Sequence, residues 1–161
     1  MRLDINKIEQ LNIEKAQIEA LTDDIYRANR GTMTFDEFYK EYGDKLHELR
    51  ERKEAIDEEI IVIKATNINV GDGISLSPYT DWEAFTVIER KDTPKGFKLV
   101  IQKDEAIRTD KNGMSDSQTY RFERDPEGRT KEVRWNPRGQ WFSADGYKVA
   151  LGRHEYFDYS F

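Results

Sequence analysis

The sequence contains no cysteine and only two histidines, His47 and His154, among its 161 residues. The absence of cysteine excludes disulfide bonds, thiolate metal sites and a cysteine nucleophile. Two histidines leave little room for a histidine-based zinc site. We therefore expect a protein without a metal or another cofactor.

Long apolar runs are missing as well. No stretch approaches the roughly 18 residues that a membrane-spanning helix needs, and the first ten residues, MRLDINKIEQ, lack the apolar core of a signal peptide. Charged residues make up 36% of the chain and hydrophobic residues 37%, with 26 basic and 32 acidic side chains, a net charge of −6 and a mean hydropathy of −0.88. This composition favours a soluble, cytoplasmic protein with no contact to a membrane.

The charge and the aromatic content both change near residue 65. Residues 1–64 carry 11 basic and 16 acidic side chains and five of the 19 aromatic ones, whereas residues 65–161 carry 15 basic and 16 acidic side chains and the other 14 aromatic ones. The length suits one domain or two small ones. We predict a helical hairpin over residues 1–64, a linker over 65–70 and a small β domain over 71–161.

The first part has the apolar periodicity of a helix followed by a second one. Apolar residues recur at helical spacing at Ile5, Ile8, Leu11, Ile18, Leu21 and Ile25. Asp4 is a suitable N-cap, and Gly31 suits the left-handed position just past a helix end. Thr34 and Glu37 have the spacing of a capping box, which predicts that the second helix begins there. The two helices should form an antiparallel hairpin or coiled coil.

The second helix has a longer apolar seam with alternating steps of four and three. Its members are Tyr42, Leu46, Leu49, Lys53, Ile56, Ile60 and Ile63, a heptad pattern with one charged position. Two helices with narrow apolar stripes bury little surface against each other, so we expect a homo-oligomer, most simply a dimer with four helices. The residues expected to mediate it are Leu46, Leu49, Ile56 and Ile60. The alternative is a hairpin that folds back on its own β domain.

The second part has the composition and turn spacing of short strands. Trp82–Glu89 and Phe97–Lys103 are rich in β-branched and aromatic residues and are separated by a turn sequence. Further strands are predicted at 119–123 and 130–135 around the turn Asp125-Pro126-Glu127-Gly128, at 140–143 and 147–151 around Ala144-Asp145-Gly146, and at 154–161. This pattern predicts an α+β chain whose β part is an SH3-like barrel or a rolled sheet.

No catalytic motif stands out in either part. The sequence has no glycine-rich phosphate loop, no HExxH and no serine elbow. Counted from Asp110, the segment DKNGMSD has its glycine fourth rather than sixth, and no glutamate follows at the twelfth place, so it does not match a calcium-binding loop. His154 beside Glu155 has the residue types of an acid–base pair, but a lone histidine beside a strand is more often structural. We therefore expect a protein that is not an enzyme.

A long polar segment, residues 104–121, interrupts the predicted strands. Loops of this length are commonly functional or disordered. Arg108 offers a fixed cation, Asn112 and Gln118 offer hydrogen-bond groups, and Met114 offers an adaptable apolar contact. We expect the segment to contact a ligand or a partner. The alternative is a surface loop with no role in binding.

Arginine and aromatic residues alternate after this segment. The candidate binding residues among them are Arg121, Arg134, Trp135, Arg153, His154 and Tyr156. Arginine binds phosphate through its forked donors and aromatic faces stack on bases, which together suit a nucleotide or a single-stranded nucleic acid. In the alternative interpretation, Phe122, Trp135 and Phe142 fill the barrel while the arginines face solvent. The acidic first part disfavours non-specific binding to duplex DNA.

Two segments carry a resemblance to known proteins. With IRTDKNGMSDSQTY and the ending GRHEYFDYSF, residues 71–161 resemble a family of small accessory proteins of tailed phages and prophages of Gram-positive bacteria. The resemblance implies a phage-type accessory protein that works in a bacterial cytoplasm. It implies no catalytic residues, and it does not extend to the hairpin of residues 1–64.

These observations favour a non-catalytic accessory protein that binds and inhibits a host component. The expected target is an antiviral defence effector or its nucleotide signal. In this hypothesis the hairpin forms the oligomer, and residues 104–121 form the binding face with the arginine and aromatic strands. Two alternatives stay open: a small β-barrel that binds nucleic acid, and a structural or assembly protein of the virion.

Overall fold

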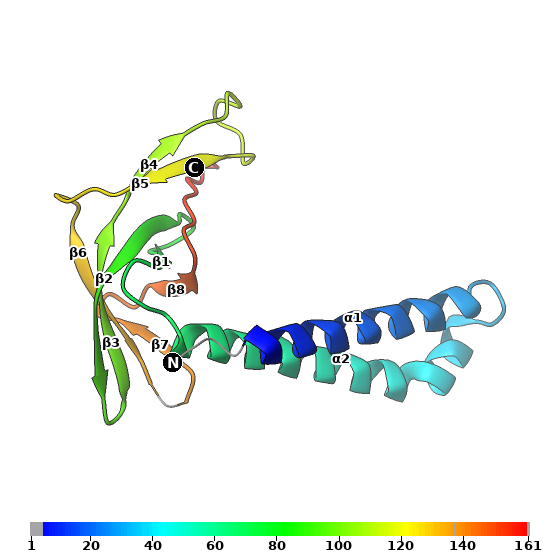
Figure 1. Cartoon of the computed structure of the whole chain (residues 1–161). Helices are drawn as coiled ribbons and strands as arrows, with labels where there is room; N and C mark the ends of the chain where they lie inside the picture. Colours follow the sequence, from blue (N-terminus) through cyan, green and yellow to red (C-terminus); the bar gives the residue numbers. More distant parts are fainter. Residues whose placement is uncertain (1–4, 137, 161) are drawn as a thin grey trace. The chain divides into compact units, whose positions relative to one another are not determined.

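The computed structural model describes residues 5–136 and 138–160, and the chain divides into two compact units, Met1–Asn67 and Ile68–Phe161. The first unit holds two helices, and the second holds a nearly closed antiparallel sheet of six strands (Figure 1). The predicted fold class, a helical hairpin followed by a small β barrel, is therefore confirmed.

Two helices, α1 (Ile5–Ala28) and α2 (Phe35–Thr66), make up the helical unit. The predicted capping box is present, because the Thr34 N–H donates to Glu37 Oε2 at 2.9 Å and the Glu37 N–H donates to Thr34 Oγ1 at 3.4 Å. Gly31 has a φ of +79°, the left-handed conformation expected between the helices. The predicted N-cap of α1, Asp4, lies outside the described residues.

The apolar seams of α1 and α2 pack against each other. Their buried core consists of Leu11, Ile18, Leu49, Ile56 and Ile60, with Ile8, Ile25 and Ile63 packed against it. Leu49, Ile56 and Ile60, predicted to mediate oligomerisation, are thus buried inside the chain because α1 covers them. Leu46, the fourth such residue, is half-buried beside a groove between the two helices. These side chains are therefore not an exposed contact surface for a second copy.

Ion pairs between the helices flank this core. Arg52 Nε lies 2.7 Å from Glu14 Oε1, and this hydrogen bond lowers the pKa of Glu14 below its usual value. Lys53, the charged position of the predicted seam, places its Nζ 2.7 Å from Glu19 Oε1. The charged member of the seam therefore joins the two helices instead of interrupting their apolar contact.

Eight strands lie in the described part of the β unit. They are β1 (Gly73–Ser77), β2 (Glu83–Thr93), β3 (Gly96–Lys103), β4 (Glu105–Arg108), β5 (Tyr120–Glu123), β6 (Thr130–Trp135), β7 (Trp141–Ser143) and β8 (Lys148–Leu151). Six of them form one antiparallel sheet in the order β7-β6-β3-β2-β1-β8, while β4 and β5 form a separate sheet. Strands β7 and β8 approach each other and nearly close the large sheet.

Side chains that alternate along the strands of the large sheet fill its core. On β3, Phe97, Leu99 and Ile101 are buried and alternate with half-buried neighbours. Trp135 on β6 is 4% exposed, and its ring centroid lies 6.3 Å from that of Phe97 and 4.8 Å from that of Trp141. Trp135 therefore fills the barrel, as one of the two interpretations expected, and its indole is not available as a surface contact.

Some strand pairings differ from the prediction. Strand β5 pairs with β4 and not with β6, although the turn between β5 and β6 is present, with the Gly128 N–H donating to the Asp125 carbonyl at 3.1 Å. Likewise β7 pairs with β6 and β8 pairs with β1, on either side of the predicted turn at 144–146. Within 154–160 the predicted strand is reduced to an isolated bridge between Trp82 and Tyr156.

Candidate functional site

The C-terminal segment, residues 152–160, borders a pocket of about 550 Å³ in the β unit. Part of its lining comes from the arm, which we define as β4, β5 and the loop 109–119 between them. The lining residues are Trp82, Gln118, Tyr120, Phe122, Ala150, Arg153, His154, Glu155 and Tyr156. We call this hollow the arm pocket. It brings together three of the predicted binding residues, Arg153, His154 and Tyr156.

Aromatic side chains from three segments line the arm pocket. Alternation along β5 places Tyr120 and Phe122 in its lining and leaves Arg121 exposed on the other face of the strand. Trp82 is held by its bridge to the C-terminal segment: its N–H donates to the Tyr156 carbonyl at 2.9 Å, and the Tyr156 N–H donates to the Trp82 carbonyl at 3.0 Å. The aromatic lining is therefore fixed by backbone hydrogen bonds.

A buried carboxylate anchors Arg153 beside the pocket. Asp104 is 2% exposed and accepts a hydrogen bond from Arg153 Nε at 3.0 Å. Arg124 Nη1, at 2.6 Å, and Thr86 Oγ1, at 2.7 Å, donate to the same carboxylate. Arg153 Nη2 also donates to Thr86 Oγ1 at 2.7 Å and to the Gly71 carbonyl at 3.1 Å. The Arg153 guanidinium is therefore a fixed part of the pocket wall, with Nε and Nη2 bonded within the fold.

His154 and Glu155 each have a structural partner of their own. Glu155 accepts hydrogen bonds from the Ala84 N–H and from Lys103 Nζ, both at 2.8 Å. His154 Nε2 lies 3.1 Å from the Leu151 carbonyl, and because a carbonyl only accepts, this nitrogen carries the ring hydrogen. The two residues therefore stabilise the pocket wall through separate contacts, with Glu155 held beside a lysine.

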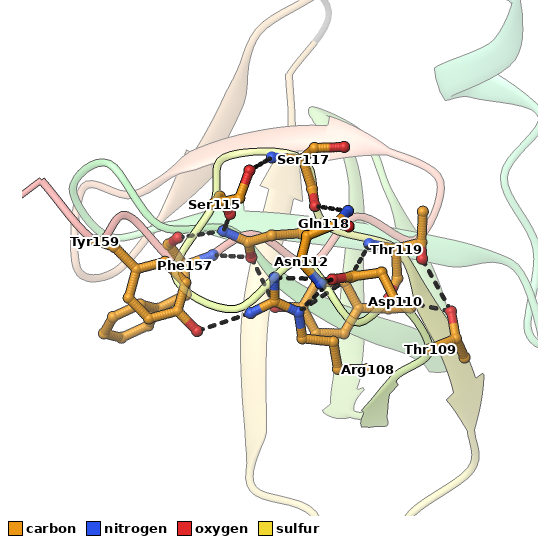
Figure 2. Close-up of polar contacts among 11 residues, drawn as sticks. Arg108, Thr109, Asp110, Asn112, Ser115, Ser117, Gln118, Thr119, Phe157 and Tyr159 are labelled. Carbon is orange, nitrogen blue, oxygen red and sulfur yellow. Dashed lines mark hydrogen bonds and ion pairs between the residues drawn. The ribbon is translucent and has the colours of Figure 1, made fainter.

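One carboxylate, Asp110, organises the loop of the arm (Figure 2). Arg108 Nε donates to it at 3.0 Å, and the N–H groups of Asn112 and Thr119 donate to it at 2.9 and 2.7 Å. The hydrogen bond from Arg108, followed by those from Thr119 and Asn112, holds the pKa of Asp110 well below its usual range. Asn112 Nδ2 also donates to the Ser117 carbonyl at 2.8 Å. Arg108 and Asn112 therefore order the loop.

The C-terminal segment is tied to this loop. Gln118 Nε2 donates to the Phe157 carbonyl at 2.6 Å, and the Phe157 N–H donates to Gln118 Oε1 at 3.0 Å (Figure 2). Tyr156 Oη donates to Asp116 Oδ1 at 2.9 Å, and this hydrogen bond raises the pKa of Tyr156. The arm and the C-terminal segment therefore support each other around the pocket.

The other predicted binding residues lie outside the lining of the arm pocket. Arg108 donates through Nη1 to Tyr159 Oη at 3.0 Å, within the fold. Met114, in the loop of the arm, is 74% exposed. Arg121 is exposed on β5, and Arg134 lines a different hollow on β6 and β7. The predicted residues therefore do not converge on one site.

Most arginines of the β unit are paired with carboxylates. The pairs include Arg121–Glu123, Arg129–Glu83, Arg134–Glu132, Arg124–Asp104 and Arg153–Asp104. A phosphate group would have to compete with these carboxylates for each guanidinium. A nucleic acid therefore gains less from these arginines than their number in the sequence suggests.

Several lining residues were not predicted as binding residues. They are Trp82, Tyr120, Phe122, Ala150 and Glu155. The alternation in Tyr-Arg-Phe-Glu at 120–123 was an available signal for Tyr120 and Phe122, because one face of a strand takes every second side chain. Trp82 had no local signal, since its place depends on a bridge to a residue far along the chain.

Comparisons with protein-family models, with curated proteins and with solved structures found no match to this chain. Over the described ranges 5–136 and 138–160, no helix is long and apolar enough to cross a membrane. In the same ranges, no three histidine, aspartate or glutamate side chains are grouped so that they could hold a metal ion. What the arm pocket binds is therefore inferred from its own side chains.

Proposed function

We propose that this chain is a non-catalytic binding protein whose arm pocket takes an apolar or aromatic side chain of a protein partner. The observation that carries the proposal is a lining of aromatic rings, Trp82, Tyr120 and Phe122 among them, around a hollow of about 550 Å³. Aromatic rings bury a large apolar area, and they are enriched in the cores of protein interfaces.

The charge of the pocket favours a protein over a phosphate ligand. Arg153 and Glu155 line it with opposite charges, and the Arg153 guanidinium is already bonded to Asp104. The phosphates of a nucleotide would meet a carboxylate and an occupied guanidinium. An apolar side chain would instead displace water from aromatic rings, which is the favourable term in most protein association.

The resemblance of residues 71–161 to accessory proteins of tailed phages extends the proposal to inhibition of a host component. We take the protein effector of an antiviral defence system, in the bacterial cytoplasm, as the first target. The exposed Met114 of the arm loop is a further contact for such a partner. Binding of a nucleotide signal, binding of nucleic acid, and a structural role in the virion are the competing functions.

Isothermal calorimetry of the full chain against purified defence effectors, cyclic nucleotides and oligonucleotides tests this proposal. We expect at least one effector to bind. Phe122→Ala should weaken that binding by about tenfold or more, because it removes an aromatic wall of the pocket. Arg121→Ala, one position earlier on β5 but on the other face, is the matched control and should bind like the wild type.

Other outcomes would replace the proposal. Unchanged effector binding by Phe122→Ala would exclude the arm pocket as the contact. Binding of cyclic nucleotides alone would favour sequestration of a signal, and salt-dependent binding of oligonucleotides alone would favour a nucleic-acid module. Turnover of any panel member would contradict a non-catalytic role, and recovery of the chain in purified phage particles would favour a virion protein.

A further inference from the structure

The five aromatic side chains of the helical unit gather at one end of the hairpin. They are Tyr26 on α1 and Phe35, Phe38, Tyr39 and Tyr42 on α2, and we call them the tip cluster. Phe38 is central, with its ring centroid 5.3 Å from that of Tyr26 and 5.4 Å from that of Tyr42. The ring centroid of Tyr39 lies 5.5 Å from that of Phe38 and 4.6 Å from that of Phe35. The rings therefore form one continuous cluster.

The tip cluster is largely exposed. Phe35 is 74% exposed, Tyr26 47% and Tyr39 45%, and they border a hollow of about 770 Å³ that Met33 helps to line. The hairpin core does not account for these rings, because it is built from leucine and isoleucine side chains. A contiguous exposed apolar patch marks an interaction site, whereas single exposed apolar residues are common and carry no such meaning.

Two arginines lie beside the rings. Arg27 and Arg30 line the same hollow, together with one carboxylate, that of Asp23. Among the described residues, no carboxylate forms an ion pair with either arginine, whereas several other cations of the hairpin are paired, as Arg52 is with Glu14 and Lys53 with Glu19. The lining of this aromatic hollow therefore holds two basic side chains against one acidic one.

We propose that the tip cluster binds a segment of a protein partner in which a large apolar side chain is flanked by carboxylates. The apolar side chain enters the hollow beside Tyr26, Phe35 and Tyr39, and the carboxylates pair with Arg27 and Arg30. Aromatic residues, methionine and arginine are the residue types that interface cores favour, and arginine and tyrosine often contribute most of the binding energy. This surface belongs to the helical unit, so it is independent of the arm pocket and of its proposed function.

Charge argues against two other occupants. In a symmetric dimer joined tip to tip, this surface would meet itself, so the four arginines lining the two hollows would share two Asp23 carboxylates. The excess of like charge across the interface opposes association. The phosphates of a nucleic acid would meet two arginines at the tip but 16 acidic against 11 basic side chains over residues 1–64. A short peptide segment carries fewer negative charges than a nucleic acid and contacts the tip alone, so the rest of the acidic hairpin repels it less.

Selection from a displayed library of short random peptides tests the proposal. The full chain is the bait, and the double variant Arg27→Glu/Arg30→Glu is used for counter-selection. We expect the enriched peptides to carry aspartate or glutamate next to leucine, phenylalanine or tryptophan. Fluorescence polarisation of a labelled enriched peptide should then show an affinity loss of about tenfold or more in the double variant and in Phe35→Ser.

Matched controls separate a contact from a change of fold. Lys40→Glu reverses an exposed charge on α2 that does not line the hollow, and Tyr79→Ser removes an aromatic ring, 86% exposed, from the β unit. Both should bind the peptide like the wild type, and every variant should keep the helical circular dichroism signal. The proposal is overturned if no acidic, apolar motif is enriched, or if the enriched peptides bind the tip variants unchanged. Tighter binding of a labelled oligonucleotide, or a dimer that the tip variants abolish in sedimentation, would overturn it as well.

Discussion

Two aromatic clusters of the β unit use the same residue types and lie in opposite environments. The closed cluster, as we call it, consists of Phe97, Trp135 and Trp141, with ring centroids 4.8 to 6.3 Å apart and with Phe97 and Trp135 each 4% exposed. In the arm pocket, by contrast, Trp82 and Tyr120 border an open hollow. Aromatic content alone therefore does not distinguish a core from a binding face.

Strand pairing explains the difference. In the closed cluster, Phe97 is paired with Trp135, and Trp135 with Trp141, across neighbouring strands. Side chains at paired positions point to the same face and contact each other. The rings of the arm pocket come from the separate β4–β5 sheet and from an isolated bridge, so no continuous register brings them together. The gap that results is where we place the side chain of a partner.

The largest effect should come from opening the closed cluster. Trp135→Ala should lower the free energy of unfolding by about 3–5 kcal/mol, because it leaves a cavity in a packed core. Phe142→Ala, on the neighbouring strand β7 and 52% exposed, should change it by less than about 0.5 kcal/mol. All three tryptophans of the chain lie in the β unit, so the two that remain in Trp135→Ala still report denaturant unfolding of that unit by their fluorescence. Equal losses in the two variants would erase the distinction between closed and open rings.

A glycine next to the closed cluster sharpens the same contrast. Gly96 has a φ of +114°, and a Cβ there would lie 1.8 Å from the Trp135 carbonyl oxygen, so the strand end would have to move. Gly96→Ala should lower the free energy of unfolding by about 3 kcal/mol or more, because the steric overlap adds to the strain of a left-handed backbone conformation. Gly113 in the arm loop has a φ of +61° and open space around it, so Gly113→Ala should cost only about 1–2 kcal/mol. The same unfolding measurement compares them, and a similar cost for both would refute the close packing.

The anchor of the arm pocket should be the next most sensitive position. Asp104→Ala leaves Arg153 and Arg124 without their buried carboxylate. It should lower the free energy of unfolding by about 3 kcal/mol, which is the lower end of the range for breaking a buried ion pair, because both arginines are partly hydrated. The control is Asp92→Ala, whose side chain is 74% exposed and also pairs with an arginine, and it should cost less than about 1 kcal/mol. If Asp104→Ala proves as mild as the control in denaturant unfolding, the pocket wall is not anchored as described.

The smallest effect should be a pH dependence of the stability that Asp110 gives to the arm. The folded chain holds the pKa of Asp110 below its ordinary value of 3.8, so this carboxylate stabilises the fold fully above about pH 4 and progressively less as the pH falls below that value. Asp110→Asn should therefore lower the melting temperature at pH 7 by more than it does at pH 3. Differential scanning calorimetry at both pH values measures this. A difference that stays constant or grows on acidification would contradict the role of Asp110 in the arm.

The helices were predictable because their signals are local. Periodic isoleucine and leucine residues and the Thr34–Glu37 box define α1 and α2 without any knowledge of the rest of the chain. The partner of the seam was not predictable in the same way. A heptad seam is satisfied equally well by a second helix of the same chain and by another copy, and the structure uses α1. A homo-oligomer stays a prediction that sedimentation would test.

In the β unit, local sequence signals predict most of the strands but not their pairing. Its strands alternate visibly, and its turns carry the expected residues, but the sequence does not tell which strands pair. The turn sequence at 125–128 favours pairing of 119–123 with 130–135. Residues 120–123 instead pair with β4, a strand of four residues at Glu105–Arg108 that was not predicted. Because the arm pocket depends on this long-range pairing, only part of its lining could be predicted from residue types.

An amide chemical-shift titration of the isotopically labelled full chain shows directly whether a partner binds at the arm pocket. The titrants are the same defence effectors and nucleotides as in the calorimetry. We expect a protein effector to perturb residues 118–122 and 153–156 around the arm pocket and to leave the closed cluster around Trp135 unperturbed. Perturbations centred on β6 and β7, or none with any member of the panel, would contradict the assignment of the arm pocket as a binding site.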